Sequence, residues 1–385
     1  MTRRTYLDFS ATAPVRPEVI RAMEPFLGDR FGNSSSVHAF GREARIAVEE
    51  SRDKVRAALG VDGGSLVFTG SGTEADNLAV LGFARRRPGA RVIRSSIEHK
   101  AVIQSTKQLA AGGYDVCAAP VDSEGVLDVE ALVKLLLDDD RATLVTVMWA
   151  NNETGAVQPM ERVADLCRER GAALHSDAVQ ALGKLPLSGD AVGVDMIAIS
   201  GHKFGGPQGV GALWVRDGIE LEPVIFGGGH QGGLRAGTEN VAGCVGLAKA
   251  AEMAVSELGT EAPRLRALRD ELQAGLEATI EGLVVNAGGA PERLPNVLNV
   301  SVPEVDIEGL LTALDLEGIC VSSGSACMTG SVEPSNVITA MGREGDLADN
   351  TLRLSLGWCT QKSDIDHALE VIPQLVQRVR EFAHN

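Results

Sequence analysis

Short apolar runs alternate with longer amphipathic stretches along the first two thirds of the chain. The runs that have the length and composition of buried strands lie at residues 65–70, 91–95, 144–149, 172–176, 196–200 and 211–215. Stretches with helical periodicity follow the first three of these runs, beginning near Gly72, Lys100 and Pro159. This alternation predicts an α/β domain with a largely parallel sheet, whose ligands bind at the carboxyl ends of the strands.

The pattern changes after about residue 257. The segment PRLRALRDELQAGLEATI is typical of a long charged helix, and shorter strands and helices are expected at 297–302, 306–314 and 351–357. We therefore predict a large α/β domain at 15–257 and a smaller α+β domain formed by 1–14 together with 258–385.

Composition and charge narrow the class of protein. The chain is 44% hydrophobic and carries a formal net charge of −16, which argues against direct binding to nucleic acid or to an anionic membrane. No apolar run approaches the roughly 20 residues that a membrane span needs. The N-terminus also lacks the apolar region of a secretory signal. These features predict a cytoplasmic globular protein.

The cysteines do not form a recognisable metal or disulfide pattern. They number six, none belongs to a C-x-x-C pair, and they lie at positions 117, 167, 244, 320, 327 and 359. Free thiols in a reducing compartment are therefore expected, and no metal site is predicted.

Polar residues follow several of the predicted strands. The stretch SGTEADNLAV places Gly72 and Thr73 at a helix start, where backbone N–H groups either bind phosphate or form an ordinary cap. Asp177 and Gln180 follow another buried strand. A carboxylate there is either a helix cap or the partner of a buried cation, such as a protonated heterocyclic nitrogen.

Lys203 is one of only eight lysines and lies between a histidine and a glycine-rich segment. A lysine that forms a Schiff base needs a pKa lowered by desolvation or nearby charge, whereas the alternative is a surface lysine in a glycine loop. His99 is either a packed residue or a ring-stacking proton carrier. Asn151 and Asn152 are either turn formers or amides that bind a ring hydroxyl. Together these side chains are the parts of a pyridoxal-phosphate site.

The sequence resembles the class V aminotransferase group and, within it, the cysteine desulfurases related to nitrogen-fixation and iron–sulfur-assembly enzymes. The resemblance extends nearly end to end, through FGNSSSVHAFGREAR, SGTEADNLA, EHKAV, WANNETGAVQP, HSDAVQALGKLPL, SGHKFGGPQGVGAL, GGGHQGGLRAGTEN, SSGSACMTGSVEPS and LRLSLG. It implies the fold-type I architecture of pyridoxal-phosphate-dependent transferases. That fold has a large domain with a mostly parallel seven-stranded sheet and a smaller α+β domain.

The resemblance also implies roles for individual residues. Lys203 resembles the Schiff-base lysine, with Asp177 on the pyridine nitrogen and His99 stacked on the ring. The residues expected to contact the ring substituents are Asn152 and Gln180. Those expected to hold the phosphate are Gly72, Thr73, Ser200, His202 and, from the partner subunit of a homodimer, Thr238. Arg353 resembles the arginine that binds the substrate carboxylate, with Asn33 assisting it.

Cys327 lies in SSGSACMTGSVEPS, whose small and hydroxyl residues predict a mobile loop. By resemblance Cys327 is the nucleophile that takes sulfur from L-cysteine as a persulfide, leaves L-alanine, and passes the sulfur to an acceptor protein. Cys320 lies in an apolar run and is expected to be an inert packed residue. Cys359 ranks below Cys327 as a nucleophile.

Several alternatives follow from the same residues. A selenocysteine lyase or another class V enzyme needs the same cofactor residues but no loop cysteine. A catalytically silent scaffold would bind no cofactor, and a nicotinamide dehydrogenase is disfavoured because no G-x-G-x-x-G follows the first strand of the sheet. The acceptor pathways of related enzymes are iron–sulfur assembly, tRNA thiolation and bacterial DNA phosphorothioation, the last of which we weakly favour.

Overall fold

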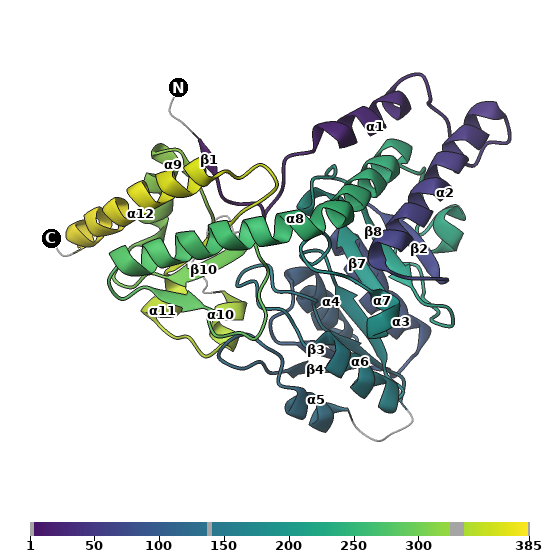
Figure 1. Cartoon of the computed structure of the whole chain (residues 1–385). Coiled ribbons are helices and arrows are strands. Elements are labelled where there is room, and N and C mark those ends of the chain that lie inside the picture. Colours follow the sequence, from purple (N-terminus) through teal and green to yellow (C-terminus); the bar gives the residue numbers. More distant parts are fainter. Residues whose placement is uncertain (1–3, 137–140, 324–334, 384–385) are drawn as a thin grey trace.

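The computed structural model describes residues 4–136, 141–323 and 335–383, and a seven-stranded sheet forms the centre of its larger part (Figure 1). The strands are β2 (Ser65–Thr69), β3 (Arg91–Ser95), β4 (Asp115–Ala119), β5 (Thr143–Thr146), β6 (Ala173–Asp177), β7 (Met196–Ser200) and β8 (Gly211–Val215), in the order β2-β8-β7-β6-β5-β3-β4. Six of these strands run in the same direction, and β8 runs in the opposite direction between β2 and β7. The predicted α/β class and mostly parallel sheet are confirmed, although β4 was not predicted.

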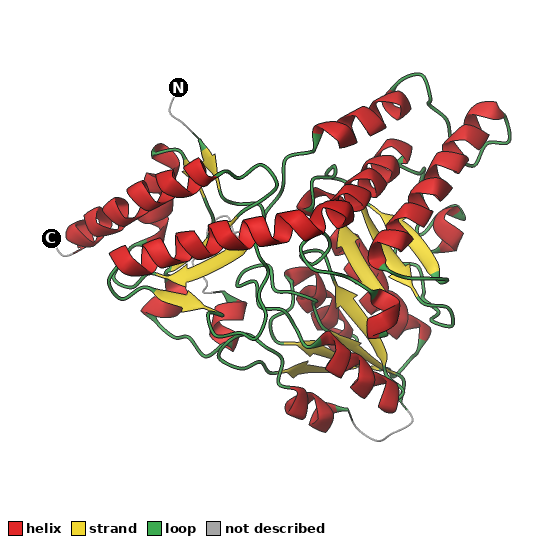
Figure 2. Ribbon diagram, viewed as in Figure 1, coloured by secondary structure: helices red, strands yellow, loops and turns green. Residues whose placement is uncertain are grey.

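Helices cover both faces of this sheet, as Figure 2 shows. Neighbouring strand residues belong to different cores: Val92 packs with one cluster and Ile93 with the other, and Leu144 and Val145 divide in the same way. One face is covered by α3 (Gly72–Arg86) and α4 (Lys100–Ala111). The helices on the other face are α1 (Pro17–Leu27), α2 (Ala39–Leu59), α5 (Val129–Leu135), α6 (Met160–Glu169) and the first half of α8. Strands buried on both faces explain the continuous apolar runs in the sequence.

A second core surrounds two small sheets. The strands are β9 (Val284–Asn286), β10 (Val297–Ser301) and β12 (Thr351–Ser355), which pair antiparallel, and β1 (Thr5–Tyr6), which pairs parallel with β11 (Ile319–Cys320). The helices α9 (Ile307–Leu316) and α12 (Lys362–Ala383) pack in this core, whereas α10 (Asn336–Ala340) and α11 (Asp346–Asp349) bury their apolar residues in a separate small cluster. The first residues of the chain thus lie beside its last third. The exact domain boundaries given above stay a prediction.

Helix α8 (Val241–Thr279) runs continuously for 39 residues through both parts of the molecule (Figure 1). Its first half buries Leu247 in the larger core, and its second half buries Leu272 in the smaller one. The helix expected at 263–280 is therefore only the second half of α8, and the prediction placed its start too late. Pro263 removes one backbone donor, but the packing of α8 along α1 and α2 outweighs this loss.

Shorter elements complete the described chain: α7 (Gly189–Val192) and the 3₁₀ turns η1 (Gly201–Lys203) and η2 (His230–Gly233). Within the ranges that the structure describes, no helix combines the length and apolar character needed to cross a bilayer.

Candidate active site

A cavity of about 390 Å³ lies at the carboxyl ends of the parallel strands, where the alternating sequence pattern places ligands. The segments after β2, β3, β5, β6 and β7 all contribute to its wall. The predicted site residues that line it are Gly72, Thr73, His99, Asn152, Asp177, Gln180, Ser200, His202, Lys203 and Arg353. Predicted site residues up to 281 residues apart in the sequence (Gly72 and Arg353) therefore share one cavity.

The start of α3 forms a close-fitting cradle at one end of the cavity. Ser71 caps this helix by accepting a hydrogen bond from the Glu74 backbone N–H at 3.1 Å. A Cβ atom at Gly72 would lie 2.8 Å from Cγ2 of Val179 and 3.2 Å from Cβ of Ser200. The wall therefore accepts only glycine at this point, and the free N–H groups of the first turn suit a phosphate.

Asp177 ends strand β6 and is almost fully buried. Its Oδ1 accepts a hydrogen bond from the Val179 backbone N–H at 2.9 Å. One ligand atom each of Asp177, Asp76 and His99 lies within 4.8 Å of the others. Burial raises the pKa of Asp177, and the facing His99 and Lys203 oppose that rise. A cationic ring nitrogen next to Asp177 would stabilise its charged form in the same way.

His99 is the cap of α4, because its Nδ1 accepts a hydrogen bond from the Ala101 backbone N–H at 3.1 Å. In the neutral ring the proton is then on Nε2. Burial lowers the pKa of His99, although the charge of Asp177 works in the opposite direction. To take up a further proton, Nδ1 would have to give up its hydrogen bond from the Ala101 backbone N–H.

Asp76 lies one helical turn after Gly72 and was missed by the sequence analysis. Its pKa is raised well above the usual range, first by burial and then by the negative charge of Asp177. Its Oδ1 has no hydrogen-bond partner among the described residues and lies 3.5 Å from Nε2 of His175. Burial lowers the pKa of His175 to about 3, so the His175 ring is neutral at pH 7.

Glu98 is a second buried acid that the sequence analysis missed, although it directly precedes His99. Its Oε1 accepts hydrogen bonds from the Ser95 hydroxyl at 2.5 Å and from the Met148 backbone N–H at 2.8 Å. Its Oε2 has no partner within the described ranges. Burial raises the pKa of Glu98 to about 8. Asp177 is thus the carboxyl most suited to carry charge in this part of the cavity.

Lys203 extends from η1 toward the N-terminal segment of the chain. Its Nζ donates hydrogen bonds to the backbone oxygens of Ser10, at 2.7 Å, and Ala11, at 2.8 Å. The neighbouring His202 is 3.1 Å from the Thr12 hydroxyl through its Nδ1. Burial lowers the pKa of His202 to about 4, so it offers a neutral ring to the site.

The two asparagines after β5 have different surroundings. Asn151 is fully buried, and its Oδ1 accepts hydrogen bonds from the backbone N–H groups of Glu153 and Thr154, both at 2.9 Å. It is therefore the turn former. Asn152 lines the cavity, where its amide can meet a ligand.

Arg353 comes from β12, in the smaller part of the molecule, and is only 4% exposed. Its Nη2 donates to Oδ1 of Asp8 at 2.9 Å, and its Nη1 donates to the backbone oxygen of Asn152 at 3.3 Å. Its Nε has no partner in the part of the chain that the structure describes. A buried guanidinium with a spare donor suits a small carboxylate.

Two of the predicted site residues that the structure describes are not in the cavity wall. Asn33 is exposed, and its Oδ1 accepts a hydrogen bond from the Ser35 backbone N–H at 2.9 Å. Thr238 is also exposed and does not line the cavity of its own chain. Cys327 lies outside the described residues. Of the other thiols considered, Cys320 is half-buried at the end of β11 and Cys359 is exposed.

The chemistry of the cavity fits pyridoxal phosphate. The α3 cradle suits the phosphate, Asp177 suits the ring nitrogen, and Lys203 supplies the amine. Buried polar atoms with no partner among the described residues, such as the Ser10 hydroxyl, indicate a wall built to meet a polar ligand.

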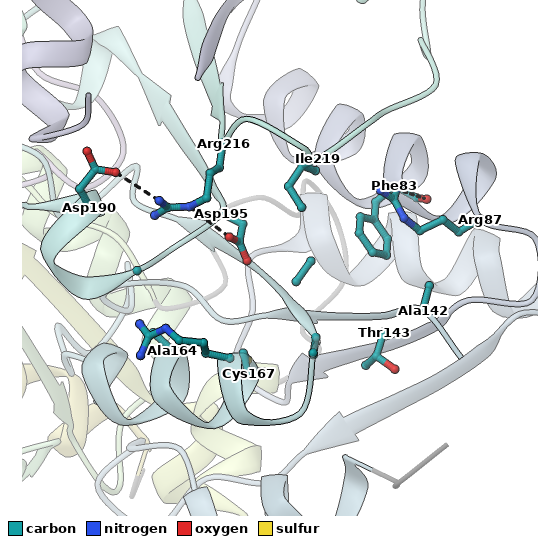
Figure 3. A pocket seen from close by; sticks show the side chains of 15 residues that line it. Phe83, Arg87, Ala142, Thr143, Ala164, Cys167, Asp190, Asp195, Arg216 and Ile219 are labelled. Carbon is teal, nitrogen blue, oxygen red and sulfur yellow. Dashed lines mark hydrogen bonds and ion pairs between the residues drawn. The ribbon is translucent and has the colours of Figure 1, made fainter. Parts of the chain in front are cut away.

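A larger cavity of about 610 Å³ lies at the amino ends of the same strands (Figure 3). Figure 3 shows Arg216 between two carboxylates, with Nη1 3.5 Å from Oδ1 of Asp190 and Nε 3.2 Å from Oδ1 of Asp195. Arg87, on the opposite side, donates to the backbone oxygen of Glu220 at 2.7 Å. None of the predicted site residues lines this second cavity.

Comparisons with known proteins place the chain among close relatives. A model of the family described as aminotransferase class-V matches residues 5–368. Cysteine desulfurase IscS of Dictyoglomus turgidum is 43% identical, over 99% of this chain and 96% of its own length. A solved NifS-like protein has a TM-score of 0.91 at 36% identity, covering 98% of this chain and 100% of its own. The structure of SspA in complex with cysteine has a TM-score of 0.80 at 32% identity, covering 91% and 98%.

Proposed function

The chain belongs to the aminotransferase class-V family, and from that premise we propose how its residues perform the reaction of a pyridoxal-phosphate-dependent cysteine desulfurase. This reaction converts L-cysteine to L-alanine and passes the sulfur to an acceptor. The observation that carries the proposal is the convergence of Lys203, Asp177, His99 and Arg353 on one cavity at the carboxyl edge of the sheet.

The cofactor is held by residues from five segments of the larger part. Gly72, Thr73, Ser200 and His202 bind its phosphate, and Thr238 of a second copy of the chain completes this site in a homodimer. Asp177 binds the ring nitrogen, and His99 stacks on the ring. When bound, the cofactor withdraws electrons from the substrate α-carbon, which makes the α-proton acidic.

Arg353 and Lys203 act on the substrate. The guanidinium of Arg353 binds the carboxylate of L-cysteine through its free Nε and a terminal nitrogen, with Asn33 assisting. This binding orients the α-carbon toward Lys203. The amine of Lys203 then removes the α-proton and returns a proton when the product forms.

Cys327 acts as the nucleophile. Its thiol first gives its proton to His99 or to the substrate amine, because the thiolate is the attacking form. The thiolate then attacks the substrate sulfur, so that an S–S bond forms and the Cβ–S bond breaks. The electron pair of the broken bond goes to the substrate carbon, which takes up a proton and leaves as L-alanine. A persulfide remains on Cys327.

The sulfur then leaves on an acceptor protein. The chain's charge of −16 supports transfer to a protein in the cytoplasm rather than direct contact with nucleic acid or membrane. Acceptors in iron–sulfur assembly, tRNA thiolation and DNA phosphorothioation all fit this chemistry. We retain phosphorothioation as the prediction, to be tested by following labelled sulfur from L-cysteine into purified acceptors of each class.

The function is tested by measuring alanine and sulfide released from L-cysteine with a thiol reductant, on wild type and on Cys327→Ser. We expect both proteins to carry the cofactor's visible absorption and only wild type to release sulfide. If Cys327→Ser keeps full activity, the nucleophile is elsewhere. If Cys327→Ser still releases selenide from L-selenocysteine at the wild-type rate and wild type scarcely uses L-cysteine, the enzyme is a selenocysteine lyase.

A further inference from the structure

Lys184 is a buried lysine that lies behind the active-site cavity rather than in its wall. It is 8% exposed, and burial lowers its pKa to about 7, with further lowering by the charges of Lys203 and Arg353. Lys184 and Lys203 both line a small cavity of about 50 Å³. The proposed mechanism assigns it no role.

The acidic residues near Lys184 are paired with other cations. Glu257 and Glu261 line the same small cavity of about 50 Å³ as Lys184. Glu257 pairs with Arg16, and Glu261 pairs with Arg264 at 2.7 Å. Within residues 4–136, 141–323 and 335–383, Lys184 forms no ion pair with a carboxylate. Burying an amine without a counter-ion destabilises a folded protein. The role of Lys184 therefore has to be sought in a contact other than an ion pair.

That contact is with Gln180. Lys184 Nζ donates a hydrogen bond to Oε1 of Gln180 at 2.6 Å, and Nε2 of Gln180 donates to the backbone oxygen of Ser10 at 2.9 Å. A charged lysine nitrogen only donates hydrogen bonds, and a backbone carbonyl only accepts them. The two partners therefore fix which end of the Gln180 amide is oxygen and which is nitrogen.

We propose that Lys184 is a positioning residue for the cofactor: it holds the Gln180 oxygen away from the cavity, so that the amide presents an N–H donor to it. Gln180 is 3% exposed and lines the cavity. An N–H donor stabilises a negatively charged oxygen on the cofactor ring, whereas the amide oxygen would repel it. This inference rests on the proposed function, because it requires that the cavity holds pyridoxal phosphate.

The test is a double-mutant cycle with Lys184→Met and Gln180→Ala. In Lys184→Met the buried Gln180 oxygen loses its partner, so conformations that turn it toward the cavity gain population. We expect the dissociation constant for pyridoxal phosphate to rise about tenfold, as loss of one hydrogen bond predicts. The pH midpoint of the bound cofactor's visible spectrum should rise by about one unit. In the Gln180→Ala background, Lys184→Met should change neither quantity.

Three outcomes overturn the proposal. One is an unchanged affinity and pH midpoint in Lys184→Met. Another is the same effect of Lys184→Met with and without Gln180, which would mean that the lysine acts through its charge alone. The third is an equal effect in Lys54→Met, the matched control, since Lys54 is a half-exposed lysine on α2. Lys184→Gln repeats the cycle if Lys184→Met does not fold, as judged by thermal unfolding of the cofactor-free protein.

These results separate the inference from the proposed function. If wild type binds no pyridoxal phosphate, the function itself is wrong. If wild type binds it and releases alanine from L-cysteine while Lys184→Met binds it equally well, only the role of Lys184 is wrong.

Discussion

The two cavities at opposite edges of the central sheet differ in whether their acidic side chains have partners. The larger one, at the amino edge, places Arg216 between Asp190 and Asp195, so both carboxylates have a cationic partner. The smaller one, at the carboxyl edge, buries Asp76 and Glu98 with oxygens that have no partner among the described residues. Buried ionisable groups without partners are costly, and they concentrate where a ligand will meet them. Volume alone would have selected the wrong cavity.

The strongest test of this comparison is Lys203→Ala, which removes the amine at the centre of the carboxyl-edge cavity. We expect kcat for alanine release to fall by about 10³-fold, because proton transfer at the α-carbon loses its carrier. The visible absorption of the purified protein should change as well. The matched control is Lys54→Ala, which should keep wild-type activity. Activity within tenfold of wild type in Lys203→Ala would contradict the proposed role.

The next largest effect is expected from Glu98→Gln, measured as stability against pH on the cofactor-free protein. The pKa of Glu98 is raised from 4.5 to about 8, so between these values the folded state binds a proton that the unfolded state has lost. Wild type should therefore lose about 1 kcal/mol relative to Glu98→Gln for each pH unit from pH 5 to pH 8.

Urea unfolding at several pH values measures this difference. The amide keeps an oxygen for the hydrogen bonds from Ser95 and Met148, so the variant should fold normally. Parallel stability curves for the two proteins would show that Glu98 is ionised in the folded state at neutral pH. The contrast between the two cavities would then rest on Asp76 alone.

A smaller effect is expected from Arg353→Lys, which keeps the charge but loses the planar donor pair. We expect KM for L-cysteine to rise about tenfold, the effect of one lost charge-assisted hydrogen bond, with a smaller change in kcat. Steady-state alanine release measures both constants. An unchanged KM would mean that the substrate carboxylate binds elsewhere.

The smallest effect is expected from Asp195→Asn, at the amino-edge cavity. Asn keeps an oxygen that can accept from the Leu174 backbone N–H, which Asp195 Oδ2 binds at 2.8 Å. The lost ion pair with Arg216 should change the free energy of unfolding by about 1 kcal/mol at most. Alanine release should stay within about twofold of wild type. A larger loss of activity would mean that the amino-edge cavity takes part in the reaction.

The sequence predicted the sheet and the edge at which the candidate cavity lies, because parallel strands buried on both faces appear as continuous apolar runs. It did not predict β4, whose sequence DVCAA has few large apolar residues. It also placed the start of α8 at Pro263 and so missed the first half of this helix. The packing of α8 against two other helices keeps this helix continuous through Pro263.

The site was predictable where a residue directly follows a strand, as Asp177 and Lys203 do. It was not predictable where a partner comes from a distant part of the chain. The contact between Gln180 and Ser10 joins positions 170 residues apart. In the sequence, Lys184 stands out only as a charged residue within an apolar segment. Its proposed role follows from its hydrogen bond to Gln180 in the structure.

The continuous helix α8 also governs how the protein loses its structure. Its 39 residues extend about 58 Å, and each half is held by a different core. If either core melted, half of the helix would lose the tertiary packing that supplies most of a helix's stability in a protein. We therefore expect Arg353, in the smaller part of the molecule, and Lys203, in the larger part, to lose their positions together in one cooperative transition rather than in two.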